Sequence, residues 1–169
     1  MAGVIVATLL IVGFVFAGNI LQVYGRGVLT IQVMDEPVKL EHLYLTIDWV
    51  RIQNEDETWV DLTLESNSEP FSFDLLTLQD QSATLSTTSI PVGRYTMIKM
   101  HVLSASTIKE GGSELTVPSD VLKVILTPSL DLANGEQTTV LVDLQPLDID
   151  EIAVSHSLNL RPVVKSVVS

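Results

Sequence analysis

The residue types that carry most enzyme and metal chemistry are widely spaced in this sequence. The three histidines, His42, His101 and His156, are far apart, and none belongs to an HExxH or HxH arrangement, so no zinc site is predicted. The serines form no G-x-S-x-G elbow and the glycines form no phosphate-binding loop. Because the chain has no cysteine, thiolate catalysis, disulfides and Cys-ligated metals are excluded. We therefore predict a protein that is not an enzyme, with no catalytic, metal or cofactor-binding residue.

Two acidic stretches contain oxygen ligands of the kind that calcium prefers. One is Asn54-Glu55-Asp56-Glu57, and the other combines Asp143 with Asp148-Ile149-Asp150-Glu151. Neither stretch has the spacing of an EF-hand loop. We therefore interpret both as solvated acidic loops.

Two tryptophans, Trp49 and Trp59, suggest a carbohydrate-binding hypothesis, because sugar rings stack on exposed aromatic side chains. Aromatic residues make up only 5 % of the chain, and most large aromatic side chains are buried in cores or interfaces. We therefore favour core or interface positions for both tryptophans.

The charge is divided sharply along the chain. Residues 1–25 contain no charged side chain, and the remainder carries the whole formal net charge of −12. An acidic surface repels the phosphates of nucleic acid and of anionic lipid, so nucleic acid is not predicted as a partner. Such a charge favours a solvated exterior.

The segment from Met1 to Tyr24 is one apolar run, for which we predict a helix. A helix of that length spans roughly 36 Å, more than the ~30 Å hydrocarbon layer of a membrane. A secretory signal peptide has a positively charged start and a shorter apolar stretch, and neither is present. The first positive side chain is Arg26, on the domain side of the segment, which violates the positive-inside rule unless a charged leader once preceded Met1.

The stretch Gly3-Val4-Ile5-Val6-Ala7-Thr8-Leu9-Leu10-Ile11-Val12 resembles the start of mature archaeal type IV pilins. Bacterial pilins usually have glutamate at the fifth mature position, where this chain has Ile5, so the resemblance favours the archaeal subtype. Small residues recur four apart, which lets helices approach closely. The predicted helix–helix assembly positions are Gly3, Ala7, Gly13 and Ala17. One alternative is an ordinary membrane anchor, in which small residues and an interfacial tyrosine such as Tyr24 are common. The other is an uncleaved targeting segment.

The pattern changes from continuous apolar to alternating after Gly25 and Gly27, which are predicted as a hinge. Short alternating runs follow, separated by turn residues, with no amphipathic helix between them. The predicted fold class is mainly β: a long apolar N-terminal α-helix over residues 1–25, then an antiparallel β-sandwich of immunoglobulin or prealbumin type over residues 28–169. Asn134-Gly135 predicts a type I′ hairpin between the flanking strands.

Several motifs occur in an order that resembles domain-of-unknown-function family 4382. They are Gly27-Val28-Leu29-Thr30-Ile31 with Met34-Asp35-Glu36-Pro37, Trp59 with Phe73-Asp74-Leu75-Leu76-Thr77-Leu78, Ile90-Pro91-Val92-Gly93-Arg94-Tyr95, Val117-Pro118-Ser119, and Leu160-Arg161-Pro162-Val163-Val164. The resemblance spans roughly Gly27 to Val168. It implies a sandwich in an exported archaeal or bacterial protein, and it brings no catalytic residues.

These observations predict a structural subunit of an extracellular type IV pilus-like filament that serves adhesion. Its partners would be identical subunits in a helical homo-oligomer, and the membrane before assembly, with burial of the apolar segment driving polymerisation. The alternative is a single-pass, surface-anchored β-sandwich that binds a glycan or an S-layer partner.

Overall fold

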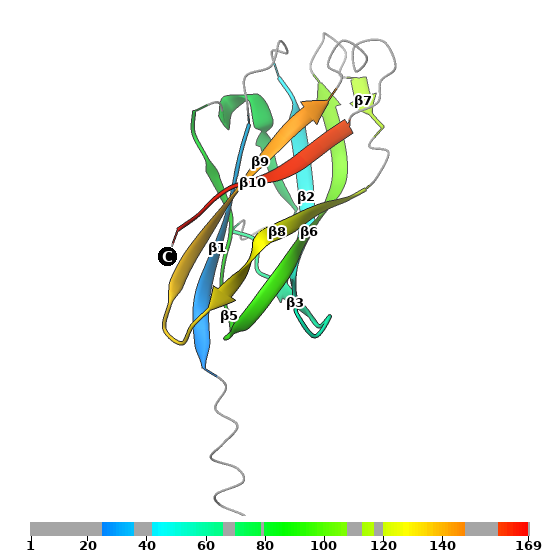
Figure 1. Cartoon of the computed structure of the whole chain (residues 1–169). Coiled ribbons are helices and arrows are strands. Elements are labelled where there is room, and N and C mark those ends of the chain that lie inside the picture. Colours follow the sequence, from blue (N-terminus) through cyan, green and yellow to red (C-terminus); the bar gives the residue numbers. More distant parts are fainter. Residues whose placement is uncertain are drawn as a thin grey trace, which may run out of the picture.

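The described part of the chain is a two-sheet β-structure (Figure 1). A computed structural model describes residues 25–35, 42–65, 70–78, 80–107, 113–116, 120–147 and 159–168. The strands are β1 (Arg26–Met34), β2 (Tyr44–Asn54), β3 (Trp59–Leu62), β4 (Phe71–Asp74), β5 (Ala83–Pro91), β6 (Gly93–Thr107), β7 (Ser113–Leu115), β8 (Val121–Leu132), β9 (Gln137–Leu147) and β10 (Asn159–Val168). A four-residue 3-10 helix, η1 (Leu75–Leu78), follows β4.

The two sheets share one apolar core. One sheet has the strand order β10-β9-β1-β5, and the other has the order β3-β2-β6-β7, in which β4 also pairs with β2 and β8 also pairs with β6. In β1 the buried side chains Leu29, Ile31 and Val33 alternate with partly exposed ones. The same alternation in β2 and β6 turns one row of residues toward the core and the next row outward. This arrangement is consistent with the β-sandwich part of the predicted fold class.

One strand pair departs from the predicted antiparallel arrangement. Strand β1 runs antiparallel to β5 but parallel to β9. The reason is the connection at Asn134-Gly135, which carries the chain from β8 in the six-stranded sheet to β9 in the four-stranded sheet. The predicted type I′ hairpin is therefore wrong. Gly135 has a positive φ of 73°, but Asn134 does not, and its side chain instead accepts a hydrogen bond from Arg26 N at 3.1 Å.

The predicted fold class also needs correction in its helical part. The described residues contain no α-helix, and their one helical element is the short η1. Residues 1–24, on which most of the helix prediction falls, lie outside the described residues. Gly25, the last residue of the predicted helix, is not helical. Its carbonyl accepts a hydrogen bond from Val92 N across the end of the sheet. The backbone there is satisfied by neighbouring strands and turns, as in a sheet.

The turn from β5 to β6 is built around Gly93. Gly93 has a φ of 153°, which favours glycine. Tyr95, two residues later, is buried, and its hydroxyl donates to the carbonyl of Pro91 at 2.6 Å. Burial raises the pKa of Tyr95, and the nearby positive charge of Arg26 partly opposes this rise. This hydrogen bond therefore fixes the position of the turn relative to the start of β6.

Candidate functional site

The predicted hinge glycines lie where β1 begins, in close contact with the β8–β9 turn. A Cβ on Gly25 would lie 2.7 Å from Asn134 Oδ1, and a Cβ on Gly27 would lie 2.7 Å from Leu132 Cγ. Arg26, between them, bonds through its guanidinium to the side chain and the carbonyl of Ser89. Both glycines are thus required for close packing, and hinge motion at them stays a prediction. The predicted assembly residues Gly3, Ala7, Gly13 and Ala17 lie outside the described residues.

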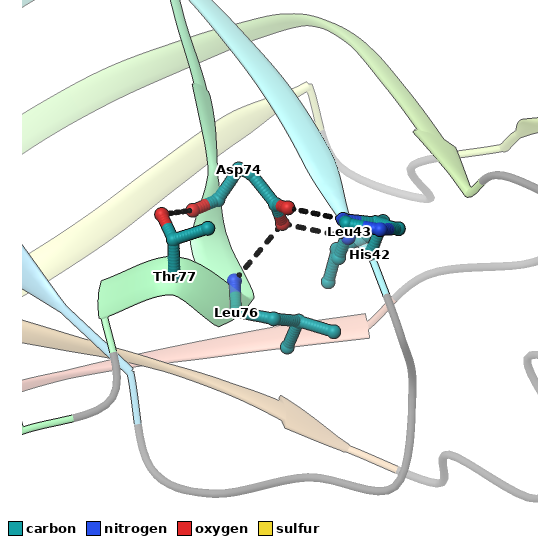
Figure 2. Close-up of polar contacts among 5 residues, drawn as sticks. All are labelled: His42, Leu43, Asp74, Leu76 and Thr77. Atoms are coloured by element: carbon teal, nitrogen blue, oxygen red, sulfur yellow. Dashed lines mark hydrogen bonds and ion pairs between the residues drawn. The ribbon is translucent and has the colours of Figure 1, made fainter.

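The first described histidine belongs to a polar cluster around Asp74 (Figure 2). Asp74 Oδ2 lies 2.6 Å from His42 Nδ1, while Oδ1 accepts hydrogen bonds from the backbone N–H groups of Leu43 at 3.0 Å and Leu76 at 3.2 Å. Thr77 Oγ1 donates to the Asp74 carbonyl at 2.8 Å. One carboxylate therefore joins the beginning of β2 to the end of β4 and caps η1.

These contacts set the charge state of Asp74. Burial acts to raise the pKa of Asp74, but the contact with His42 and the two backbone N–H donors outweigh it, so the pKa is lowered. Only 9 % of the Asp74 side chain is exposed, whereas 45 % of the His42 side chain is exposed. The ionised carboxylate is held as a structural acceptor.

The second described histidine lies on the outer face of the six-stranded sheet. His101 Nδ1 is 2.5 Å from Asp48 Oδ1, and its ring stacks on Trp49 with centroids 5.4 Å apart. The guanidinium of Arg51 lies over the Trp49 ring at 4.0 Å and pairs with Asp61 at 3.6 Å. Trp49 therefore contacts a histidine and an arginine on the sheet surface, outside the core.

The same face carries a row of basic side chains, which we call the cationic row: Arg51, Lys99 and Lys123. The strand register pairs Arg51 of β2 with Lys99 of β6, and Lys99 with Lys123 of β8. Their chain neighbours on both sides, such as Ile98 and Met100, are buried, so the row points outward.

Two flanking rows contain the tryptophans. One row is Trp59, Gln53, Met97 and Ile125, and the other is Trp49, His101 and Val121. Lys99 Nζ lies over the Trp59 ring at 4.3 Å. The two tryptophans, predicted as core or interface residues, are both outside the buried core, at partly exposed positions on either side of the cationic row. The prediction of core positions for the two tryptophans is therefore wrong.

Sequence reasoning missed the cationic row because its members are 24 to 72 positions apart in the chain. The sequence does contain a local indication of these outward positions, because each basic residue interrupts a run of apolar residues in its strand. The strand register that brings the three together is not encoded in any one segment.

The acidic stretches are partly described. Glu55, Asp56 and Glu57 are exposed, as predicted for a solvated loop. Asp143 is different, because it is fully buried on β9, where its Oδ2 accepts from Gln145 Nε2 at 3.0 Å and from Lys165 Nζ at 3.3 Å. Asp148, Asp150 and Glu151 lie outside the described residues, as does His156. Asp143 joins β9 to the edge strand β10.

Within the described ranges, no three His, Asp or Glu side chains come together in a group able to hold a metal ion. No helix in this part of the chain has the length and apolar character needed to cross a membrane.

The comparisons with known proteins bear on the domain alone. A search of curated proteins gives no match to this chain. A family model described as "Domain of unknown function (DUF4382)" matches residues 26–162, which confirms the domain part of the resemblance noted from the motifs. That range begins at the first residue of β1 and ends within β10. The chain therefore belongs to the DUF4382 family.

Proposed function

We propose that the β-sandwich is an extracellular, non-catalytic binding module that recognises a glycan through the outer face of its six-stranded sheet. The observation that carries this proposal is the pair of partly exposed tryptophans, Trp49 and Trp59, on one sheet face with the cationic row between them. Large aromatic and arginine side chains on a surface are the residues that most often dominate binding energies. A sheet face also presents them at fixed spacing.

The test is a carbohydrate array probed with the full-length protein in mild detergent. We expect retention on at least one class of glycan, and weaker retention of Trp59→Ala with unchanged circular dichroism. Failure to bind any glycan on an array that includes neutral and acidic polymers would contradict the proposal.

A second function, assembly into an adhesive type IV pilus-like filament, is favoured by the distribution of charge. Residues 1–24 carry no charge, while the described domain is acidic and begins immediately after them at β1. Burial of that apolar segment among identical copies, at roughly 25 cal/mol per Å², supplies a driving force, and repulsion between acidic domains opposes lateral clumping. Both functions can belong to one protein, since they use different parts of the chain.

Shearing of cells followed by electron microscopy tests assembly. We expect sheared filaments to contain this chain, and a variant without residues 1–24 to be absent from them. Recovery of the full-length protein only in the membrane fraction, as a monomer in detergent, would contradict assembly and leave the binding proposal intact.

A further inference from the structure

Building on the proposed glycan-binding function, we propose that the ligand of the six-stranded sheet is an acidic polysaccharide, with carboxylate or sulfate groups at regular intervals. The polymer lies across β2, β6 and β8, with its anionic groups on Arg51, Lys99 and Lys123. Trp49 and Trp59 flank it on either side.

The three cations are placed unfavourably within the sheet. Like charges directly opposite on neighbouring strands destabilise a sheet. Here Arg51 is opposite Lys99, and Lys99 is opposite Lys123. The chain has only nine lysines and arginines against 21 acidic residues, so opposite charges are abundant elsewhere on the domain. A local arrangement that costs stability without a structural gain is characteristic of a functional site.

Most of the charge in the cationic row is not neutralised by neighbouring side chains. Arg51 pairs with Asp61 at 3.6 Å, but among the described residues neither Lys99 nor Lys123 has an ion-pair partner. Lys99 contacts the Trp59 ring, which leaves its ammonium group open to a further anion. Lys123 is exposed on β8. Two lysines are thus available to an anionic ligand beside an aromatic surface.

Spacing favours a polysaccharide over nucleic acid. Neighbouring strands lie about 4.8 Å apart, so the row presents three charges across about 10 Å. Each strand of a DNA duplex carries one phosphate per about 3.4 Å of helix axis, a denser array than the row matches. The formal net charge of −12 repels any polyanion, so binding has to rest on contacts with the cationic row itself.

Isothermal titration of the full-length protein in mild detergent tests the proposal with three probes: polygalacturonate, neutral amylose and a double-stranded DNA oligonucleotide. We expect binding to polygalacturonate that weakens as salt is raised, and much weaker binding to the other two. Lys123→Gln should weaken polygalacturonate binding about two- to fivefold, as for a single exposed ion pair. Trp59→Ala should weaken it about two- to tenfold through lost aromatic contact.

The matched control is Arg161→Gln, which removes the same charge from an exposed position on β10 in the other sheet. It should leave polygalacturonate affinity unchanged, and an equal loss in both variants would overturn the assignment to this face. Equal, salt-independent binding of amylose would overturn the acidic ligand while leaving glycan binding intact. Tighter binding of the oligonucleotide would also overturn it. Failure of all three probes would contradict this proposal, and binding of other glycans on the array would then decide the general function.

Discussion

The molecule contains two His–Asp pairs with nearly the same geometry and different surroundings. His42 and Asp74 are 2.6 Å apart, and His101 and Asp48 are 2.5 Å apart. Asp74 also accepts two backbone hydrogen bonds and is almost buried, whereas 31 % of the Asp48 side chain is exposed and His101 is its hydrogen-bond partner among the described residues. In the first pair the histidine lies at the edge of a structural cluster, and in the second it stacks on Trp49.

The contrast shows that the chemistry of the pair does not define its role. The role depends on what else the carboxylate and the imidazole contact. Asp74 accepts hydrogen bonds from two backbone N–H groups, so it contributes to folding. Asp48 orients a histidine beside an aromatic ring on the proposed binding face, so it contributes to the shape of that surface.

The largest difference is expected between the two aspartate-to-alanine variants. Asp74→Ala leaves the N–H groups of Leu43 and Leu76 without their acceptor and should lower the free energy of unfolding by about 2–4 kcal/mol. Asp48→Ala breaks one partly exposed pair and should cost about 1 kcal/mol or less. Urea unfolding followed by circular dichroism measures both. Equal losses would remove the distinction between the pairs.

Acid should act on the first pair through Asp74. The pKa of Asp74 is lower in the folded protein than the ordinary value of 3.8, so the unfolded chain binds the proton more readily. Its contribution to stability is therefore complete above that ordinary value, and it is lost as the pH falls below it, through the folded pKa. Unfolding midpoints measured between pH 2 and pH 6 should decline less steeply in Asp74→Asn than in the wild type. Identical slopes would contradict this role of the carboxylate.

The smallest effects are expected for the histidines themselves. His42→Ala removes one of three partners of the Asp74 carboxylate from a half-exposed position, and should lower stability by about 0.5–1 kcal/mol. His101→Ala should change stability by a similar amount or less but should alter the fluorescence of Trp49, on which its ring stacks. Together, the stability and fluorescence measurements distinguish the His42–Asp74 pair from the His101–Asp48 pair. A change in tryptophan fluorescence of the same size in His42→Ala would argue against the separation.

The sheet part of the fold could be predicted from the sequence, because the alternation of apolar and polar residues along a strand is a local property. Leu29, Ile31 and Val33 alternate with polar residues, and they are buried in β1 as that pattern requires. The connection of the chain from one sheet to the other could not be predicted in the same way. Asn134-Gly135 has the composition of a hairpin turn, but Asn134 is used as an acceptor for Arg26 N, and the chain crosses to the other sheet.

The candidate site was predicted less well than the fold. The sequence drew attention to Trp49 and Trp59, but low aromatic content made core positions the favoured interpretation. The exposure of Trp49 depends on bulges in β2, where the register with β6 shifts on either side of Ile47. Such a shift moves a side chain to the other face of a sheet, and no local pattern reports it. The cationic row depends on the same long-range register.

The position of β1 has a mechanical consequence. This strand begins at Arg26 and runs through the interior of its sheet, bonded along its length to β5 on one side and β9 on the other. Tension that reaches the chain at Gly25 is directed along the strand, so it loads both ladders in shear, and many backbone bonds must break together. The domain therefore resists being pulled from its N-terminal side far better than it would if an edge strand such as β10, which could peel away one bond at a time, received the load.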